Sequence, residues 1–451
     1  MNRIERHVNV AVVGGGVVGG SLVNKLVRFT DIPTIALFEM GDTIGNLNSK
    51  VTNNSGTIHD GSTEHYKRDK VVKVKADTDI TVTDLKKLIG VNPDMYRKGP
   101  KFLLGVGDEE CDIVSTRSEE FSPFFPEMEL IYGAEIARRE PMVMKGRNPK
   151  ENVVAISNPG YTIDFGLLAQ WYVNDAVSTG RLLRYMNTRI MERQITRIGD
   201  KYLLTDSKGF QYTADVVIFA TGAYSLIAAK ALGLGQHLGI LPIGGNFYDS
   251  IVPLLIGKVY TVQNPKRPFA AVHGDAEMHN PNITRFGPTA IVLPTLVDGD
   301  WSTVMDFLRV SVPTWDGVAT LTGILADPEM LGYMAQNMSF QLPLIGKDLF
   351  TQSARKIIPS LQSSQLVFHK GRGLRPQLVD TIKRTLELGD TQVVGPNFLG
   401  NIAPSPGASI APANALRDTK KVIEFFQGAY SFNTEKYEEY YGTEKQSALV
   451  G

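Results

Sequence analysis

Four glycines near the start of the chain have the spacing of a loop that binds phosphate groups. Gly14, Gly15, Gly16 and Gly19 follow the run Val8–Val13, which is typical of a buried parallel strand. The first glycine permits a tight turn, the middle ones let backbone N–H groups approach a pyrophosphate, and the last lets the next helix pack closely. The pattern therefore predicts a dinucleotide site.

The elements that must position this loop follow in order along the chain. A helix is predicted over Val17–Arg28, with its N-terminus directed at the phosphates, and a second strand over Thr34–Phe38, which ends at Glu39. An acid at that place accepts hydrogen bonds from a ribose and disfavours a cofactor with a 2′-phosphate. The ordered set is far more specific than the glycines alone, which also occur in turns without a ligand.

Two later segments favour FAD over NAD. A hydrophobic strand over Asp215–Phe219 runs into Ala220, Thr221 and Gly222, and the alternating residues and turns of Ile190–Tyr212 predict a small β-meander before it. Taken alone, Ala220–Gly222 is equally consistent with an ordinary turn. Near the C-terminus a loop over Asn401–Ser409 precedes a helix predicted from about Pro412. We therefore expect FAD as the cofactor, with its ring at this last loop.

Both ends of the chain offer residues for the flavin. N–H groups of the loop over Asn401–Ser409, at the start of the late helix, would stabilise negative charge on the ring. The polar loop NNSGTIHDG contains Asn54, Ser55 and His59, and its small residues allow the backbone to approach the ring. We expect this loop to contact the ring, the ribityl chain or the pyrophosphate, with His59 on the cofactor side and not as the base.

The candidate chemistry is the oxidation of a 2-hydroxy acid. Two strands predicted within Phe269–Ala290 carry His273 and Arg285, and the segment HKGRGLRPQLVD carries Arg375 and Gln377. A neutral imidazole accepts a hydroxyl proton near pH 7, and arginine forks hold carboxylates. Each residue also has a structural alternative, as a histidine satisfied within its strand or as an arginine in a salt bridge. The residues alone predict an FAD-dependent oxidoreductase and leave its substrate open.

Composition excludes several other classes of protein. The 451 residues include 47 basic and 47 acidic ones, so nucleic acid is not expected as a partner. The single Cys111 excludes an intrachain disulfide, and no metal site is expected. No apolar run is long enough to span a bilayer, and we expect no signal peptide.

Motifs along nearly the whole chain carry a resemblance to a known family. They are VVGGGVVGG, SGTIHDGS, LLGVGDEEC, GKVYTVQNPKRPFAAVHGD, TRFGPTA, KIIPSL, LRPQLVD and SPGAS. In this order they resemble the malate:quinone oxidoreductases, in the flavoprotein group that includes D-amino-acid oxidase and L-2-hydroxyglutarate dehydrogenase. The first motif is common to many flavoproteins, whereas the others are much more specific.

The resemblance implies oxidation of malate to oxaloacetate, with electrons passed through FAD to a membrane quinone, by a peripheral protein on the cytoplasmic face of the membrane. It implies His273 as the general base, Arg285 and Arg375 as carboxylate anchors, Gln377 beside the substrate, and Gly407 and Ala408 beside the flavin. The longer branch of that family has alanine at the position of Ser55. The alternatives are another 2-hydroxy acid, such as 2-hydroxyglutarate or lactate, or a catalytically silent FAD-binding redox sensor.

We predict an α/β fold, with a Rossmann-like FAD domain of the two-dinucleotide-binding type and an interleaved α+β substrate domain on a larger mixed or antiparallel sheet. The FAD domain would take residues 1–85, 155–235 and 365–430, and the substrate domain 86–154 and 236–364, before a tail over 431–451. A helix is predicted over Asp164–Ser178, with Asp164 as its N-cap.

Two aromatic or apolar segments are candidates for contact with the membrane. They are Phe121–Pro126 and Leu254–Tyr260, which includes Lys258. The alternative for each is packing inside the substrate domain.

Overall fold

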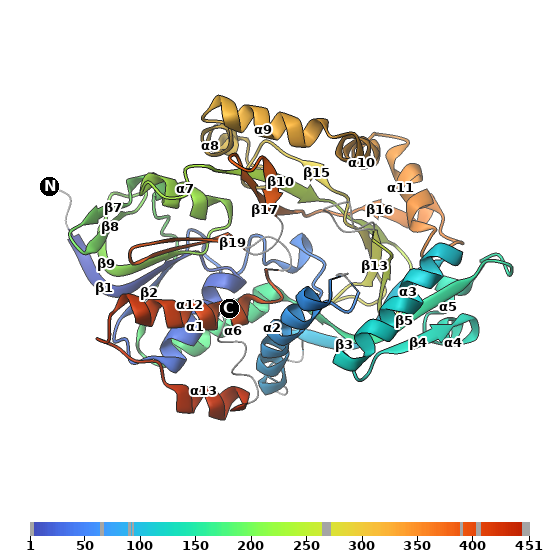
Figure 1. Cartoon of the computed structure of the whole chain (residues 1–451), viewed down its shortest axis with the longest axis horizontal. Helices are drawn as coiled ribbons and strands as arrows, with labels where there is room; N and C mark the ends of the chain where they lie inside the picture. Colours follow the sequence, from blue (N-terminus) through green and yellow to red (C-terminus); the bar gives the residue numbers. More distant parts are fainter. Residues whose placement is uncertain are drawn as a thin grey trace.

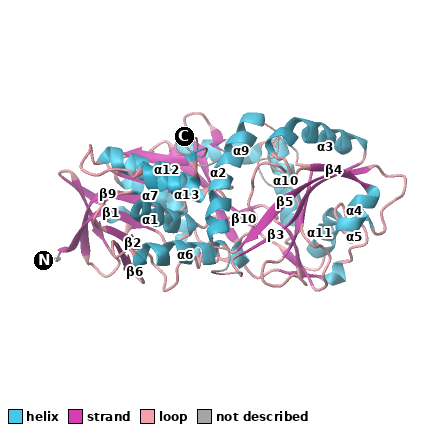
Figure 2. Ribbon diagram, turned by 90° about the horizontal axis from the view of Figure 1, so that it is seen from below, coloured by secondary structure: helices cyan, strands magenta, loops and turns pink. Residues whose placement is uncertain are grey.

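The computed structural model describes residues 4–63, 67–88, 92, 94–263, 272–387, 391–402 and 407–443. Two lobes lie side by side in both views (Figures 1 and 2). Residues 269–271 of the predicted strand pair and 403–406 of the predicted flavin loop lie outside the described residues. No helix in the described ranges is long and apolar enough to cross a bilayer.

The first lobe is built on an eight-stranded sheet with the order β19-β20-β9-β1-β2-β6, and β8 pairs with both β7 and β9. Its strands are β1 (Ile4–Val13), β2 (Ile35–Phe38), β6 (Leu182–Tyr185), β7 (Thr196–Ile198), β8 (Lys201–Thr205), β9 (Gln211–Phe219), β19 (Thr391–Gly395) and β20 (Phe398–Ile402). β20, β9, β1, β2 and β6 run parallel, whereas β7, β8 and β9 form an antiparallel meander. A parallel sheet places the carboxyl ends of its strands at one edge, where a dinucleotide binds.

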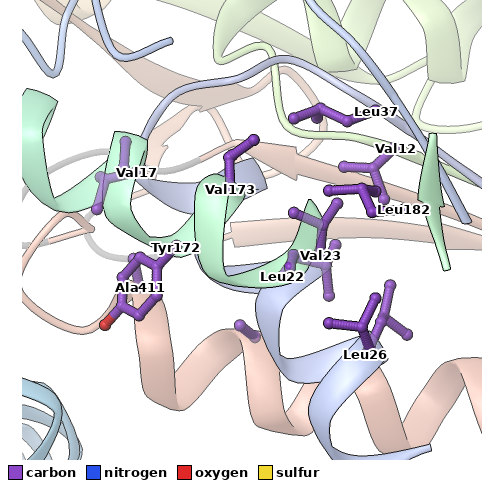
Figure 3. Packing of buried hydrophobic residues seen from close by; sticks show 14 of the residues in the cluster. Val12, Val17, Leu22, Val23, Leu26, Leu37, Tyr172, Val173, Leu182 and Ala411 are labelled. Atoms are coloured by element: carbon purple, nitrogen blue, oxygen red, sulfur yellow. The ribbon is translucent and has the colours of Figure 1, made fainter. Parts of the chain in front are cut away.

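Helices pack on this sheet and on one another, and they bury the apolar side chains of the lobe. They are α1 (Val17–Phe29), α2 (Arg68–Lys87), α6 (Phe165–Ser178), α7 (Ala223–Ala231), α12 (Ala411–Phe425) and α13 (Thr434–Tyr441). Figure 3 shows Leu22, Val23 and Leu26 of α1 packed with Val173 of α6 and with Val12 of β1, all fully buried or nearly so. The Asp164 side chain accepts a hydrogen bond from Leu167 N at 2.9 Å, which confirms the predicted cap of α6.

The second lobe holds two further sheets. An eight-stranded sheet has the order β16-β11-β14-β13-β12-β3-β5-β4, and a four-stranded sheet has the order β15-β10-β17-β18. The strands are β3 (Tyr96–Val106), β4 (Glu129–Tyr132), β5 (Val153–Ile163), β10 (Leu238–Gly245), β11 (Tyr248–Ser250), β12 (Lys258–Thr261), β13 (His273–Ala276), β14 (Thr284–Gly287), β15 (Ile291–Val292), β16 (Leu366–Phe368), β17 (Gly373–Asp380) and β18 (Thr385–Glu387). Most neighbours pair antiparallel, and β12 with β3 is parallel.

Helices also flank these sheets. α3 (Asp108–Phe121), α4 (Gly133–Arg139) and α5 (Pro141–Met144) lie beside β3, β4 and β5, while α8 (Val304–Ser311), α9 (Trp315–Ala326), α10 (Pro328–Ser339) and α11 (Gly346–Ala354) follow the top edge of the molecule in Figure 1. The predicted fold class is therefore confirmed. The domain boundaries that we placed along the chain stay a prediction.

Candidate active site

The glycine loop leaves no room for side chains. Gly14 has a φ of +105°, and a Cβ there would lie 2.5 Å from Ala220 O. A Cβ on Gly19 would lie 1.8 Å from Gly14 O, because α1 starts directly against the loop. Gly16 caps α1 without a side-chain hydrogen bond. The backbone cradle and the helix N-terminus therefore fit the pyrophosphate of FAD.

Glu39 and Ser49 surround this cradle. The Glu39 carboxylate accepts hydrogen bonds from Gly15 N and Gly41 N, both at 2.7 Å, so it holds the loop open at the end of β2. Ser49 Oγ accepts a hydrogen bond from Val17 N at 3.0 Å, in the first turn of α1. We did not predict Ser49 from the sequence, because it lies in a loop without a distinctive motif. Each carboxylate oxygen keeps a further lone pair, and the contact of Glu39 with a ribose stays a prediction.

The segment after β9 abuts the same loop. Ala220 N donates to Val13 O at 2.8 Å, which joins the carboxyl ends of β9 and β1. Gly222 has a φ of +61° and lies near Pro376 of β17, the strand that carries Arg375. Ala220 and Gly222 therefore connect the glycine loop with the second lobe.

The loop NNSGTIHDG is fixed between the two lobes. His59 N donates to Ser409 Oγ at 3.0 Å, and that hydroxyl donates to Thr57 O at 3.2 Å. Ser409 follows Gly407 and Ala408 in the turn that leads into α12. The two segments predicted to contact the flavin thus lie against each other, although 350 positions separate His59 from Ser409 in the chain.

The Asn54 side chain makes its hydrogen bonds within its own segment of the chain. Its Nδ2 donates to Asn48 O and Lys50 O, and its Oδ1 accepts from Gly56 N at 2.8 Å. Ser55 O lies 3.3 Å from Lys258 Nζ of β12. The contacts of Asn54, Ser55 and His59 with FAD stay predictions.

Two cross-strand pairs of β12 and β13 form the part of the site that lies against this loop. In the register of β12 and β13, Lys258 lies opposite Asp275 and Tyr260 opposite His273. The Tyr260 ring stacks on the His273 ring with centroids 4.4 Å apart, and Tyr260 OH donates to Thr57 Oγ1 at 3.1 Å. Tyr260 thus connects the predicted base to the loop NNSGTIHDG (residues 53–61), the flavin-side loop.

Asp275 lies between Lys258 and His273 in the protein interior. Its Oδ1 is 3.3 Å from Lys258 Nζ and its Oδ2 is 3.3 Å from His273 Nε2, and all three side chains are buried. Burial by itself would raise the pKa of Asp275, but the charges of Lys258 and His273 outweigh it and lower the pKa to about 2. Burial also lowers the pKa of Lys258, against the attraction of Asp275. A carboxylate so held can orient the imidazole.

Arg285 is already paired. Its Nη1 donates to Val51 O and Asn54 O, at 3.1 and 3.2 Å, and its Nε lies 3.3 Å from Asp249 Oδ1. His369 joins this cluster, with Nδ1 at 2.6 Å from the other Asp249 oxygen and Nε2 at 2.8 Å from Thr52 O. Asp249 carried no signal in the sequence, since it sits in a short strand far from its partners.

Arg375 differs from Arg285 because no carboxylate faces it among the described residues. The guanidinium is half-buried, and burial lowers its pKa while Tyr333 and Tyr260 lie close enough to oppose that shift. Gln377, two positions along β17 and therefore on the same face, has a buried Oε1 without a hydrogen-bond donor in the described part of the chain. The Arg375 guanidinium and the Gln377 amide oxygen thus lie on one face of β17. Tyr260, which stacks on His273, lies near the guanidinium.

A small cavity of about 10 Å³ lies where several predicted residues meet. Ser55 of the flavin-side loop, Asp275 of β13 and Arg285 of β14 line it. Such a volume holds about one water molecule. The structure therefore brings the flavin-side loop and the predicted catalytic strands into contact.

The two segments considered for membrane contact bury most of their large apolar side chains. Phe121 and Phe125 belong to one apolar core, and Leu254, Leu255 and Val259 to another. Lys258 and Tyr260 belong to the site described above, and of the second segment only the Ile256 side chain is widely exposed. Packing inside the second lobe is thus the interpretation that holds for both segments.

Comparison with solved structures identifies the fold. The L-alpha-glycerophosphate oxidase from Mycoplasma pneumoniae, with FAD bound, aligns with a TM-score of 0.62 and 17% identity over 94% of this chain and 96% of its own. Glycine oxidase from Geobacillus kaustophilus gives a TM-score of 0.62 and 17% identity, over 93% and 95%. At this identity the likeness concerns the fold alone.

Comparison of sequences identifies the family. The family model described as FAD dependent oxidoreductase matches residues 9–413. A probable malate:quinone oxidoreductase of Campylobacter jejuni is 35% identical, over 96% of this chain and 98% of its own. A malate:quinone oxidoreductase of Helicobacter pylori is 34% identical, over 95% and 96%. FAD is thus the cofactor, and the chain belongs to the FAD-dependent oxidoreductase family and, within it, to the malate:quinone oxidoreductases.

Proposed function

We propose that this enzyme oxidises malate to oxaloacetate and passes the electrons through FAD to a quinone in the membrane. When bound, FAD accepts the hydride from the hydroxyl-bearing carbon and delivers electrons to the quinone. The names of relatives that match nearly the whole chain support this substrate pair. The enzyme would work as a peripheral protein at the cytoplasmic face of the membrane.

The side chains of the site bind the substrate carboxylates and accept the hydroxyl proton. Arg375 binds one carboxylate of malate, and Gln377 Oε1 accepts a hydrogen bond on the same face of β17. The His273 imidazole takes the hydroxyl proton, while Asp275, held by Lys258, orients the ring as a positioning residue. Tyr260 covers His273 and helps to exclude water. Arg285 holds the flavin-side loop through Nη1, and its Nη2, which lies 3.8 Å from a Glu277 oxygen, would bind the second carboxylate.

The observation that carries this proposal is the guanidinium of Arg375. A half-buried cation attracts an anion, and the described residues place no carboxylate beside this one. A dicarboxylate substrate supplies that anion. Arg375 lies near Tyr260, and Tyr260 stacks on His273. The proposed carboxylate anchor is therefore close to the proposed proton acceptor.

Anaerobic bleaching of the flavin tests the proposal. Malate should bleach the purified enzyme faster than 2-hydroxyglutarate or lactate, and a quinone should restore the colour. His273→Asn should lower the rate of bleaching by about 10²–10⁴-fold, the usual contribution of a general base. His279→Asn, a change on the turn after β13, should bleach normally.

Two results would reject this assignment. Preference for another 2-hydroxy acid would replace malate as the substrate. A yellow protein that no hydroxy acid bleaches would instead indicate a redox sensor.

A further inference from the structure

An apolar groove lies between the loop that joins α10 to α11 and the edge strand β16. It has a volume of about 540 Å³, and Leu342, Leu344, Val367 and Phe368 line it together with Tyr248. Figure 1 shows the connection between α10 and α11 at the upper right of the molecule. The groove is formed by residues that neither the sequence motifs nor the candidate active site include.

The side chains at this groove are unusually exposed for apolar residues. Leu344 is 96% exposed, and Ile345 and Phe368 are each 52% exposed. Leu344 also has a φ of 75°, which is strained for a leucine and turns its side chain away from the protein. A cluster of exposed apolar side chains on one loop and one strand marks a surface that binds another apolar phase.

The charges around the groove fit an anionic surface. Lys347 is the one charged residue among those that line it, and exposed Lys370 follows Phe368 by two positions. The α10–α11 connection itself carries no charged residue, and Asp348 is the acid in the first turn of α11. Lysines beside inserted apolar side chains are typical of proteins that bind anionic phospholipids.

The groove is also directly connected to the candidate active site. Tyr248 and Phe368 face each other across β11 and β16, with ring centroids 5.5 Å apart. The next residues along the two segments are Asp249 and His369, which contact each other and reach Arg285 and Thr52 O. The groove wall and the contacts that hold the flavin-side loop thus come from consecutive residues, whose side chains point to opposite faces of the strand.

We propose that this groove is the surface by which the enzyme docks on the lipid bilayer. Leu344 and Ile345 insert among the acyl chains, and Lys347 and Lys370 meet the headgroups. The lipid-soluble quinone then approaches the flavin side from the membrane, which is the part of this inference that rests on the proposed function.

Binding to vesicles tests the docking surface without use of the catalytic reaction. The probes are vesicles of phosphatidylcholine with and without phosphatidylglycerol, and the proteins are the holoenzyme, Leu344→Glu and Ile345→Glu. Each variant should lower the vesicle partition coefficient about ten-fold or more, since it removes the burial of one large apolar side chain. Ile382→Glu is the matched control, because Ile382 is 76% exposed and does not line the groove.

Activity readouts separate this inference from the proposed function. Malate should bleach the flavin of every variant equally, and a water-soluble quinone should reoxidise it, whereas reduction of a long-chain quinone in vesicles should fall with binding. If malate bleaches none of the proteins, the proposed function is rejected. The docking surface is then tested by the vesicle-binding measurements alone.

Three outcomes would overturn the docking surface. One is unchanged vesicle binding by both groove variants. Another is binding that is abolished by salt and is equal in all variants, which would assign attachment to surface charge alone. The third is a dimer of the wild type that Leu344→Glu dissociates without any change in vesicle binding, which would show that a second copy covers the groove.

Discussion

Replacement of Arg375 by methionine should weaken catalysis and strengthen the fold. Methionine fills much of the same volume without the charge, so the variant no longer holds a guanidinium in a half-buried place that lacks a carboxylate. Removal of such an uncompensated charge should raise the free energy of unfolding by about 1 kcal/mol, the low end of the range for buried ionic groups.

The loss in catalysis follows from the number of hydrogen bonds. A guanidinium binds a carboxylate through two charge-assisted hydrogen bonds, each worth about 1.5–3 kcal/mol. Arg375→Met should therefore lower kcat/KM for malate by about 10²–10⁴-fold, mainly through KM. Arg375→Lys keeps the charge but loses the planar fork, so we expect it to raise KM by about ten-fold.

Arg285→Met is the matched control, because the two arginines differ in their partners. Arg285 donates hydrogen bonds to Val51 O, Asn54 O and the Asp249 carboxylate. Loss of these hydrogen bonds in Arg285→Met should lower the free energy of unfolding by about 3 kcal/mol, the low end for a broken buried pair. His369 remains beside Asp249 and limits the cost.

The assay compares thermal unfolding of the FAD-loaded proteins without malate with steady-state rates at a range of malate concentrations. The unfolding midpoint should rise for Arg375→Met and fall for Arg285→Met. If both midpoints fall together and the KM of Arg375→Met equals that of the wild type, Arg375 is a structural residue and the argument from its missing partner is refuted.

Three further predictions concern other parts of the molecule. Asp275→Asn should slow flavin reduction while FAD stays bound; because this change leaves buried Lys258 without its carboxylate partner, the double variant with Lys258→Met should fold better than the single one, and full activity in either would contradict the orienting role. Gly19→Ala should purify without FAD, since its Cβ would meet Gly14 O; a yellow variant would contradict this. Burial raises the pKa of Glu140 from 4.5 to about 7 against hydrogen bonds from Ile256 N and Gly257 N. The unfolded chain then releases this proton at lower pH than the folded one, so stability should fall by about 3 kcal/mol from pH 4.5 to 7, and Glu140→Gln should remove that slope in urea titrations.

The nucleotide-binding half of the fold was predictable because its signals are local. The glycines, the helix from Val17 and the strand that ends at Glu39 lie within one short stretch, and each has a direct physical requirement. The cap at Asp164 and the meander before β9 were predictable for the same reason, and the structure confirms them.

The catalytic strands were predictable only in part. His273 and Arg285 were assigned to a pair of strands, and the structure confirms the pair. Asp275 had a usable signal, since it lies two positions after His273 and so on the same face of a strand. Lys258 and Tyr260 had none, because their place opposite Asp275 and His273 depends on the register of β12 against β13, which the intervening residues do not encode locally.

The two arginines show what the sequence leaves undecided. Arg285 and Arg375 have the same side chain and comparable glycine-rich surroundings in the sequence, so both were predicted as carboxylate anchors. Asp249 is 36 positions from Arg285, and Val51 O is 234 positions away. A guanidinium inside a protein has to be compensated by an anion or by carbonyl oxygens. The fold brings that compensation to Arg285 from distant segments and, among the residues that the structure describes, brings no carboxylate to Arg375. We therefore propose that the partner of Arg375 comes from outside the chain, as a substrate carboxylate.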